Sequence, residues 1–225
     1  GGFPFSMNQN EKRMILTSVQ KPGRYAGGEY GQVIKDRAAV SARFAFCFPD
    51  TYEIGMSNLG VRILYHCLNL HERIWCERVY DPWVDMQEKM KEYDLPLTAG
   101  VESGDPLSVF DFIGFTLQYE MSYTNVLNVL ELGRVPIWAR ERGEHDPLVI
   151  GGGPCSYNPE PVADFFDLFN IGEGEEMLPE IVELYIAMRD EGSYTRAAFL
   201  HRAAATIPGV YVPSLYDVTY NEDGT

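Results

Sequence analysis

Apolar residues along this chain alternate between short continuous runs and stretches with helical spacing. The runs predict strands, and the stretches in which apolar residues recur every three or four positions predict helices. The predicted strands cover residues 42–48, 76–80, 112–117, 148–150 and 168–171. The predicted helices cover residues 59–67, 81–93, 122–132, 174–189 and 195–205. This regular alternation is typical of an α/β protein whose parallel sheet is covered on both faces.

Five strands with helices between them predict a doubly wound parallel sheet of the flavodoxin-like type. All five strands are expected to pair in parallel. Six of their apolar side chains are predicted to lie in the core: Phe44, Phe46, Ile113, Phe115, Val149 and Ile171.

Capping residues place the helix boundaries. Ser57 or Asn58 suits the cap of the first helix, and Asp81 followed by Pro82 suits the cap and first turn of the second. The first helix carries its apolar residues at helical spacing: Leu59, Ile63, Leu64 and Cys67. The helix over 174–189 is predicted to present one apolar face: Leu178, Ile181, Val182, Tyr185 and Met188.

The chain divides into a main domain with an extension at each end. Residues 42–190 form the predicted Rossmann-type domain, and the turn-rich segment 7–41 is expected to wrap its edge. Residues 191–225 predict a helix followed by strand pieces from 210 to 220. The Asp-Gly near the end is typical of a hairpin turn, which a second strand should follow, so this segment is expected to link to a further domain. Residues 1–6, ahead of Met7, are interpreted as a cloning remnant.

Composition narrows the possible partners. Of the 225 residues 45% are hydrophobic, and 18 Lys and Arg against 33 Asp and Glu give a net charge of −15. That charge opposes attraction to nucleic acid and to anionic membranes, so neither is expected as a direct partner. No apolar run approaches the ~20 residues of a membrane span.

The four cysteines lie at positions 47, 67, 76 and 155, without the spacing of a metal site. Reduced thiols in strand and helix interiors favour a cytoplasmic protein.

The loops that follow the strands hold the candidate chemistry, because ligands of doubly wound folds bind beyond the carboxyl ends of the strands. These loops carry a glycine triplet, an acidic glycine-rich segment and several polar side chains. The candidate binding residues are Asp50, Tyr52, Gly55, Thr116, Gln118, Gly151, Gly152, Gly153, Gly172, Glu173 and Gly174.

Each candidate also has an ordinary structural explanation. Asp50 could cap a turn, and Thr116 could be a β-branched strand residue. The acids of 172–176 are stabilised by the macrodipole at the start of a helix, and they argue against a phosphate site there. Three consecutive glycines are harder to explain structurally, since a turn needs one or two and each extra glycine costs roughly 0.5–1 kcal/mol.

Six segments taken in order resemble the N-terminal cobalamin-binding-like domain of radical S-adenosylmethionine (SAM) proteins. They are residues 50–55, 57–60, 114–120, 151–154, 158–161 and 172–175. Arg-Tyr-x-Gly-Gly-Glu at 24–29 resembles an uncharacterised subfamily, and the likeness extends over about residues 22–185. The resemblance implies that Thr116 matches the serine of the family's Ser-x-Leu pattern, although Gln118 stands in place of leucine.

The resemblance further implies that Gly151 to Gly153 form the backbone floor under the ligand. Tyr52 stands where the family has its cobalt-ligating histidine. A phenol with a pKa near ~10 is a poor cobalt donor, so any bound cobalamin is expected without a histidine lower ligand.

The sequence contains no Cys-x-x-x-Cys-x-x-Cys motif, which the family uses to hold a [4Fe-4S] cluster next to SAM. The resemblance places that motif in a downstream radical domain, the expected partner of this chain, so this chain alone should be catalytically silent. Three hypotheses remain. They are a cobalamin-binding accessory domain, a scaffold or substrate-recognition domain that has lost the ligand, and a free-standing flavodoxin-like or receiver module. The third ranks last, because a receiver needs a lysine where this chain has acids.

Overall fold

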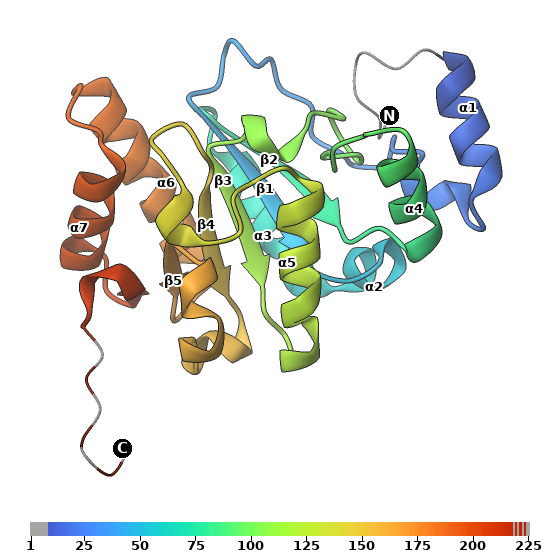
Figure 1. Ribbon diagram of the computed structural model, residues 1–225. Helices are drawn as coiled ribbons and strands as arrows, with labels where there is room; N and C mark the ends of the chain where they lie inside the picture. The colour runs from blue at the N-terminus through green and yellow to red at the C-terminus, as the bar shows by residue number, and fades with distance from the viewer. Residues whose placement is uncertain (1–8, 218, 220, 222, 224–225) are drawn as a thin grey trace.

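The computed structural model describes residues 9–217, 219, 221 and 223 of the chain. Six strands form one sheet in the order β2-β1-β3-β4-β5-β6 (Figure 1). The strands are β1 (Ala42–Phe48), β2 (Ile74–Tyr80), β3 (Phe112–Thr116), β4 (Leu148–Gly152), β5 (Leu168–Asn170) and β6 (Val210–Tyr211). The first five pair in parallel, which confirms the predicted flavodoxin-like sheet. The short β6 adds a sixth strand that pairs antiparallel with β5.

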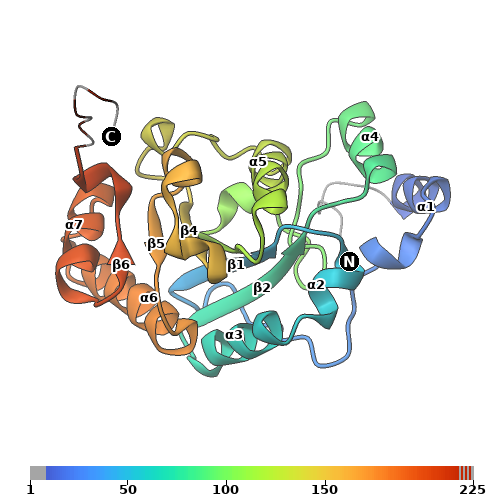
Figure 2. The same ribbon diagram turned by 90° about the horizontal axis from the view of Figure 1, so that it is seen from below.

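Helices cover both faces of the sheet (Figures 1 and 2). They are α1 (Gln9–Ser18), α2 (Tyr52–Ser57), α3 (Leu59–Leu70), α4 (Val84–Glu92), α5 (Tyr123–Leu132), α6 (Gly174–Asp190) and α7 (Arg196–Thr206). Side chains from α3, α6 and α7 share one buried cluster with Phe44 and Phe46. Side chains from α1, α4 and α5 share the other with Ala45 and Cys47. Successive residues of β1 therefore feed opposite layers, as the two-residue repeat of a strand requires.

Five of the six predicted core residues are buried, with exposed fractions of 3% or less. Ile171 is the exception and is half-buried. The predicted C-terminal end of β5 was one residue too late. The strand ends at Asn170, and Ile171 packs at the margin of the core while its N–H donates to the carbonyl of Gly209.

The buried face of α3 differs from the predicted one. Asn58 caps the helix as expected, its side chain accepting from the N–H of Val61 at 3.0 Å. However, Leu59 and Ile63 are exposed, and the residues that face the core are Val61, Tyr65 and Leu68. Both sets have helical spacing, so periodicity alone did not decide which set packs on the sheet.

The start of α4 was also predicted too early. The helix begins at Val84, and Trp83 occupies its cap position. The Asp81 carboxylate is engaged elsewhere, because it accepts a hydrogen bond from the Asn128 side chain of α5 at 2.7 Å. The predicted apolar face of α6 is confirmed in all five of its residues.

Side chains form hydrogen bonds with backbone groups along the outer edge of β2. The Asn69 amide bonds both the N–H and the carbonyl of Cys76, and Glu102 accepts from the N–H of Arg78. Lys35 donates to the carbonyl of Ile74. Part of the N-terminal extension thus runs along this edge, while residues 9–18 form helix α1 where turns were expected.

At the C-terminal side, Thr195 caps α7 through the N–H of Ala198. Residues 213–215 form a 3-10 turn, and of the strand pieces expected over 210–220 only Val210–Tyr211 is a strand. The described residues do not include positions 218 and 220, residues 1–6, or Gly224 of the Asp-Gly pair near the end. Among the described residues, no helix combines the length and apolarity needed to cross a bilayer.

Candidate functional site

A crevice opens at the carboxyl ends of β3, β4 and β5, between the first turns of α3 and α6. Its volume, counted as the space open to the centres of water molecules, is about 180 Å³. This is at least about ten times the ~10–15 Å³ that a single water needs. The bottom is apolar, formed by Phe46, Leu64, Ile150 and Leu178.

Seven of the predicted site residues line this crevice together. They are Thr116, Gln118, Gly152, Gly153, Gly172, Glu173 and Gly174. They follow three neighbouring parallel strands, so the sheet itself brings the three loops to one edge. Gln118 and Thr116 are joined by a hydrogen bond of 2.7 Å from the amide to the hydroxyl.

The three glycines serve different purposes. A side chain at Gly151 would start 2.6 Å from the ring of Phe169, on the face opposite the crevice. Gly153 has φ of +91°, which favours glycine. At Gly152, a Cβ atom would meet Asn170 at 3.8 Å, an ordinary van der Waals contact, so no clash requires a glycine there.

Asn170, a crevice residue that the sequence analysis missed, is the last residue of β5. Its side chain is buried, with 4% exposed, and its Oδ1 has no hydrogen-bond partner among the described residues. Its Nδ2 makes one long contact of 3.4 Å to the carbonyl of Gly172. A buried acceptor without a partner costs roughly 1–3 kcal/mol, which a bound donor would recover. A polar residue at the end of a predicted strand was the signal available in the sequence.

The remaining predicted site residues lie outside the crevice lining. Asp50 accepts from the hydroxyl of Tyr119 and from the N–H of Thr51. Gly55 packs against Tyr80, whose ring occupies the place where a side chain at position 55 would begin.

Tyr52 begins α2 and is held by the protein itself. Its hydroxyl donates to the Glu29 carboxylate, and its ring meets that of Tyr80 edge-on at 5.6 Å between centroids. Burial, reinforced by the Glu29 hydrogen bond, raises the pKa of Tyr52 to about 12. The hydroxyl therefore stays protonated throughout the physiological range.

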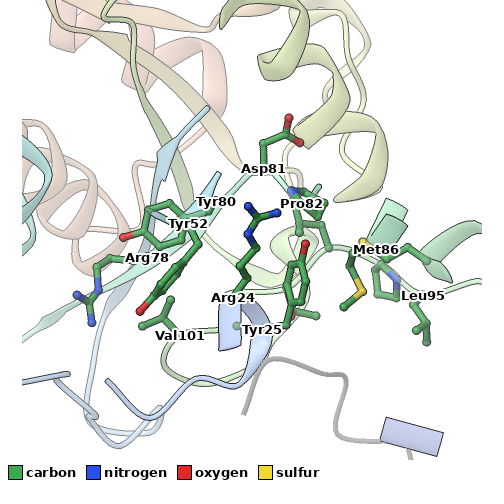
Figure 3. A pocket seen from close by; sticks show the side chains of 15 residues that line it. Arg24, Tyr25, Tyr52, Arg78, Tyr80, Asp81, Pro82, Met86, Leu95 and Val101 are labelled. Carbon is green, nitrogen blue, oxygen red and sulfur yellow. The ribbon is translucent and has the colours of Figure 1, made fainter. Parts of the chain in front are cut away.

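A second hollow, here called the Tyr52 pocket, lies beside this ring at the carboxyl end of β2 (Figure 3). Arg24 and Tyr25 from the N-terminal extension and Tyr80 from β2 line it together with Tyr52. The sequence analysis did not predict this pocket, because its walls come from segments far apart in the chain.

Asp81, at the end of β2, is the one carboxyl that lines the Tyr52 pocket. Burial raises its pKa to about 7, opposed by the hydrogen bond from Asn128 and reinforced by the nearby charge of Asp50. Its protonation state thus changes near neutral pH.

The described residues contain no group of three or more His, Cys, Asp and Glu side chains placed to hold a metal ion. Cys47 and Cys76 are fully buried, and burial raises the pKa of both thiols. None of the four histidines lines the crevice.

The sheet order and the two helical layers define a doubly wound α/β domain of the flavodoxin-like class. A family model described as "Radical SAM proteins, N-terminal" matches residues 60–213, so the chain belongs to this family of N-terminal regions of radical SAM proteins. This confirms the radical SAM part of the resemblance. Cobalamin binding stays a prediction.

Among curated proteins, the chain is similar to "Uncharacterized protein MJ0966" of Methanocaldococcus jannaschii, with 26% identity over 158 residues. The match covers 68% of this chain and 28% of that protein, so the chain corresponds to little more than a quarter of the relative's length. No solved structure matches the chain.

Proposed function

We propose that this chain is the cobalamin-binding domain of a radical SAM iron-sulfur enzyme and that its crevice holds the base and sugar of the cofactor's nucleotide tail. The domain itself performs no radical chemistry in this proposal. The [4Fe-4S] cluster and SAM belong to a separate radical domain of the whole protein, which is the partner of this one.

The pairing of Asn170 with Gly152 carries the proposal. The Asn170 Oδ1 is buried without a hydrogen-bond partner among the described residues, and a Cβ at the neighbouring Gly152 would meet Asn170 at 3.8 Å without a clash. A glycine that no clash requires, beside a buried amide oxygen without a partner, is a feature expected of a ligand site, since folding alone gains nothing from either.

The shape and chemistry of the crevice fit a flat base attached to a sugar. The apolar bottom suits an aromatic base, and the rim supplies hydroxyl, amide and carboxylate groups from Thr116, Gln118 and Glu173. The acids at the start of α6 disfavour a phosphate in the crevice itself and suit sugar hydroxyls, which donate hydrogen bonds.

The absence of histidine from the crevice lining and the engagement of Tyr52 with Glu29 support cobalamin bound base-off and without a protein nitrogen on cobalt. When bound, cobalamin would supply a cobalt centre able to carry an alkyl group. The residues of this chain would bind the tail, orient it and exclude water from the base.

A titration of the purified chain with hydroxocobalamin, read by absorption spectroscopy, tests the proposal. Saturable binding with a base-off spectrum is expected, and cobinamide, which lacks the nucleotide tail, should bind at least about tenfold more weakly. Gly152→Leu should abolish binding. Gly143→Leu, at an exposed glycine remote from the crevice, should leave it unchanged.

Two results would overturn the proposal. One is the absence of binding at high micromolar hydroxocobalamin, and the other is equal affinity for cobalamin and cobinamide. A spectrum with protein nitrogen on cobalt would refute the histidine-free arrangement in particular.

The alternative is a scaffold or substrate-recognition domain that has lost cobalamin. The observation in its favour is Tyr52, because the side chain at the family's cobalt-ligating position is packed against Tyr80 and bonded to Glu29. A folded chain that fails to bind cobalamin would select this alternative.

A further inference from the structure

The Tyr52 pocket is separate from the crevice, since no residue lines both. Five segments enclose it: the turn Pro22–Tyr25, the start of α2, the end of β2, helix α4 and the loop over residues 95–101. The backbone of the extension is tied to this loop by the N–H of Gly28, which reaches the carbonyl of Val101 at 3.4 Å. The extension therefore acts as one wall of the pocket.

The pocket has room for one small ring. Its volume on the same measure is about 60 Å³, a third of that of the crevice and several times the ~10–15 Å³ that a single water needs.

The walls are flat or soft apolar surfaces. Tyr25, Tyr52 and Tyr80 contribute aromatic faces and edges, and Met86 and Met90 contribute thioethers that adapt to irregular shapes. Each tyrosine hydroxyl already has a hydrogen-bond partner. The hydroxyl of Tyr25 accepts from the N–H of Trp83, that of Tyr52 donates to Glu29, and that of Tyr80 donates to the sulfur of Met56. The rings are thereby fixed in place.

Arg24 supplies the polar group of the pocket. Figure 3 shows its guanidinium between the rings of Tyr52 and Tyr80 on one side and Tyr25 on the other. In the part of the chain that the structure describes, Glu53 is the one carboxylate that contacts Arg24, and it does so at Nε, at 2.9 Å. Glu53 also pairs with Lys21 at 3.0 Å, so two cations share a single carboxylate at the mouth of the pocket.

A cationic ligand has little to bind here. Among the described residues that line the pocket, Asp81 carries the one carboxyl, and it accepts from Asn128 and points away from Arg24 in Figure 3. The other guanidinium in the lining, Arg78, is paired with the buried Glu102 at 2.7 Å. The available charge of the pocket is therefore the positive charge of Arg24, in a chain whose net charge is −15.

We propose that the Tyr52 pocket binds a single-ring aromatic carboxylate, with the ring among the tyrosines and methionines and the carboxylate on the terminal nitrogens of Arg24. A guanidinium offers a planar fork that matches a carboxylate, and the low-polarity walls strengthen the pair. This site is independent of cobalamin binding in the crevice.

Calorimetric titration of the purified chain with phenylacetate is the direct test. Phenylacetamide has the same shape without the charge, and phenethylamine carries the opposite charge. Phenylacetate should bind at least about tenfold more tightly than phenylacetamide, and phenethylamine should not bind. Saturating hydroxocobalamin should leave the phenylacetate affinity unchanged, because the two sites share no residue.

Two variants probe the role of Arg24. Arg24→Gln should lower phenylacetate affinity to that of phenylacetamide, which itself should not change. Glu53→Gln should raise phenylacetate affinity severalfold, because it removes the competing carboxylate, and it provides a test should Arg24→Gln fail to fold. Arg202→Gln, an exposed and distant arginine, is the matched control.

Three outcomes would overturn the proposal. The first is no binding at about 10 mM phenylacetate, a concentration chosen because one-ring ligands bind weakly. The others are equal affinity for phenylacetate and phenylacetamide, and unchanged phenylacetate affinity in folded Arg24→Gln.

Discussion

The crevice and the Tyr52 pocket lie at the same edge of one sheet but are built from different materials. The crevice combines an apolar bottom with glycines from the strand-end loops, and Asn170 and the rim residues supply its polar side chains. Side chains that already hold one another form the pocket, through contacts such as Tyr52 with Glu29 and with Tyr80. The crevice should therefore tolerate substitution without loss of stability, whereas the pocket should not.

The largest expected effect concerns Asp81 beside the Tyr52 pocket. Its pKa is raised from 3.8 to about 7, so the folded state holds the proton where the unfolded chain has lost it. Stability should fall as the pH rises from 3.8 to about 7 and then level off, because each pH unit is worth about 1.4 kcal/mol. The total is about 4 kcal/mol as an upper bound.

Asp81→Asn keeps an acceptor for Asn128 and removes the charge. The variant should match the wild type near pH 4 and exceed it by up to a few kcal/mol at pH 8. Urea unfolding at both pH values measures this. An equal difference at the two pH values would show that the carboxyl is not held protonated by the fold.

Glycine substitutions compare the two sites directly. Gly55→Ala should destabilise the fold by about 1–3 kcal/mol, because the new methyl group collides with the Tyr80 ring. Gly152→Ala should be neutral or stabilising by up to about 1 kcal/mol, since its Cβ meets Asn170 at 3.8 Å, an ordinary van der Waals distance. Thermal unfolding of the pair measures both, and similar losses at the two positions would break the comparison.

Tyr52→Phe is expected to have a smaller effect. It removes the hydroxyl that bonds Glu29 and should cost about 0.5–1.5 kcal/mol in unfolding free energy. Cobalamin affinity should not change, because Tyr52 does not line the crevice. A tenfold loss of cobalamin affinity in this variant would instead place Tyr52 at the cofactor, as the family pattern suggested.

Asn170→Ala should have the smallest effect on stability, within about 1 kcal/mol, because the amide makes only one long hydrogen bond within the fold. The same change should weaken cobalamin binding by about tenfold, the equivalent of one lost hydrogen bond of ~1.4 kcal/mol. Measuring unfolding and hydroxocobalamin titration on one preparation separates the two effects.

The fold was largely predictable because parallel strands buried on both faces leave continuous apolar runs in the sequence. Helix α1 was missed because its composition is mostly polar, and the strand pieces predicted over 210–220 gave no sign that Val210–Tyr211 would pair antiparallel with β5. The buried face of α3 depended on tertiary packing, since two sets of residues with helical spacing compete in that helix.

The candidate site was predictable in part for a similar reason. The rule that ligands bind at strand ends correctly gathered Thr116, Gly152 and Glu173 at one crevice. It could not separate Tyr52 from them, because the direction of a loop side chain depends on its neighbours. Arg24 reaches the end of β2 from a segment about fifty residues away, a contact that spacing does not encode.

The side-chain bonds along β2 have a consequence for how the molecule behaves in a crowded solution. Asn69, Glu102 and Lys35 occupy backbone groups that an exposed edge strand would offer to another chain. Such open edges recruit strands from neighbouring molecules and lead to fibrous aggregates. A seven-residue strand at the margin of the sheet is thereby prevented from acting as a template for intermolecular assembly.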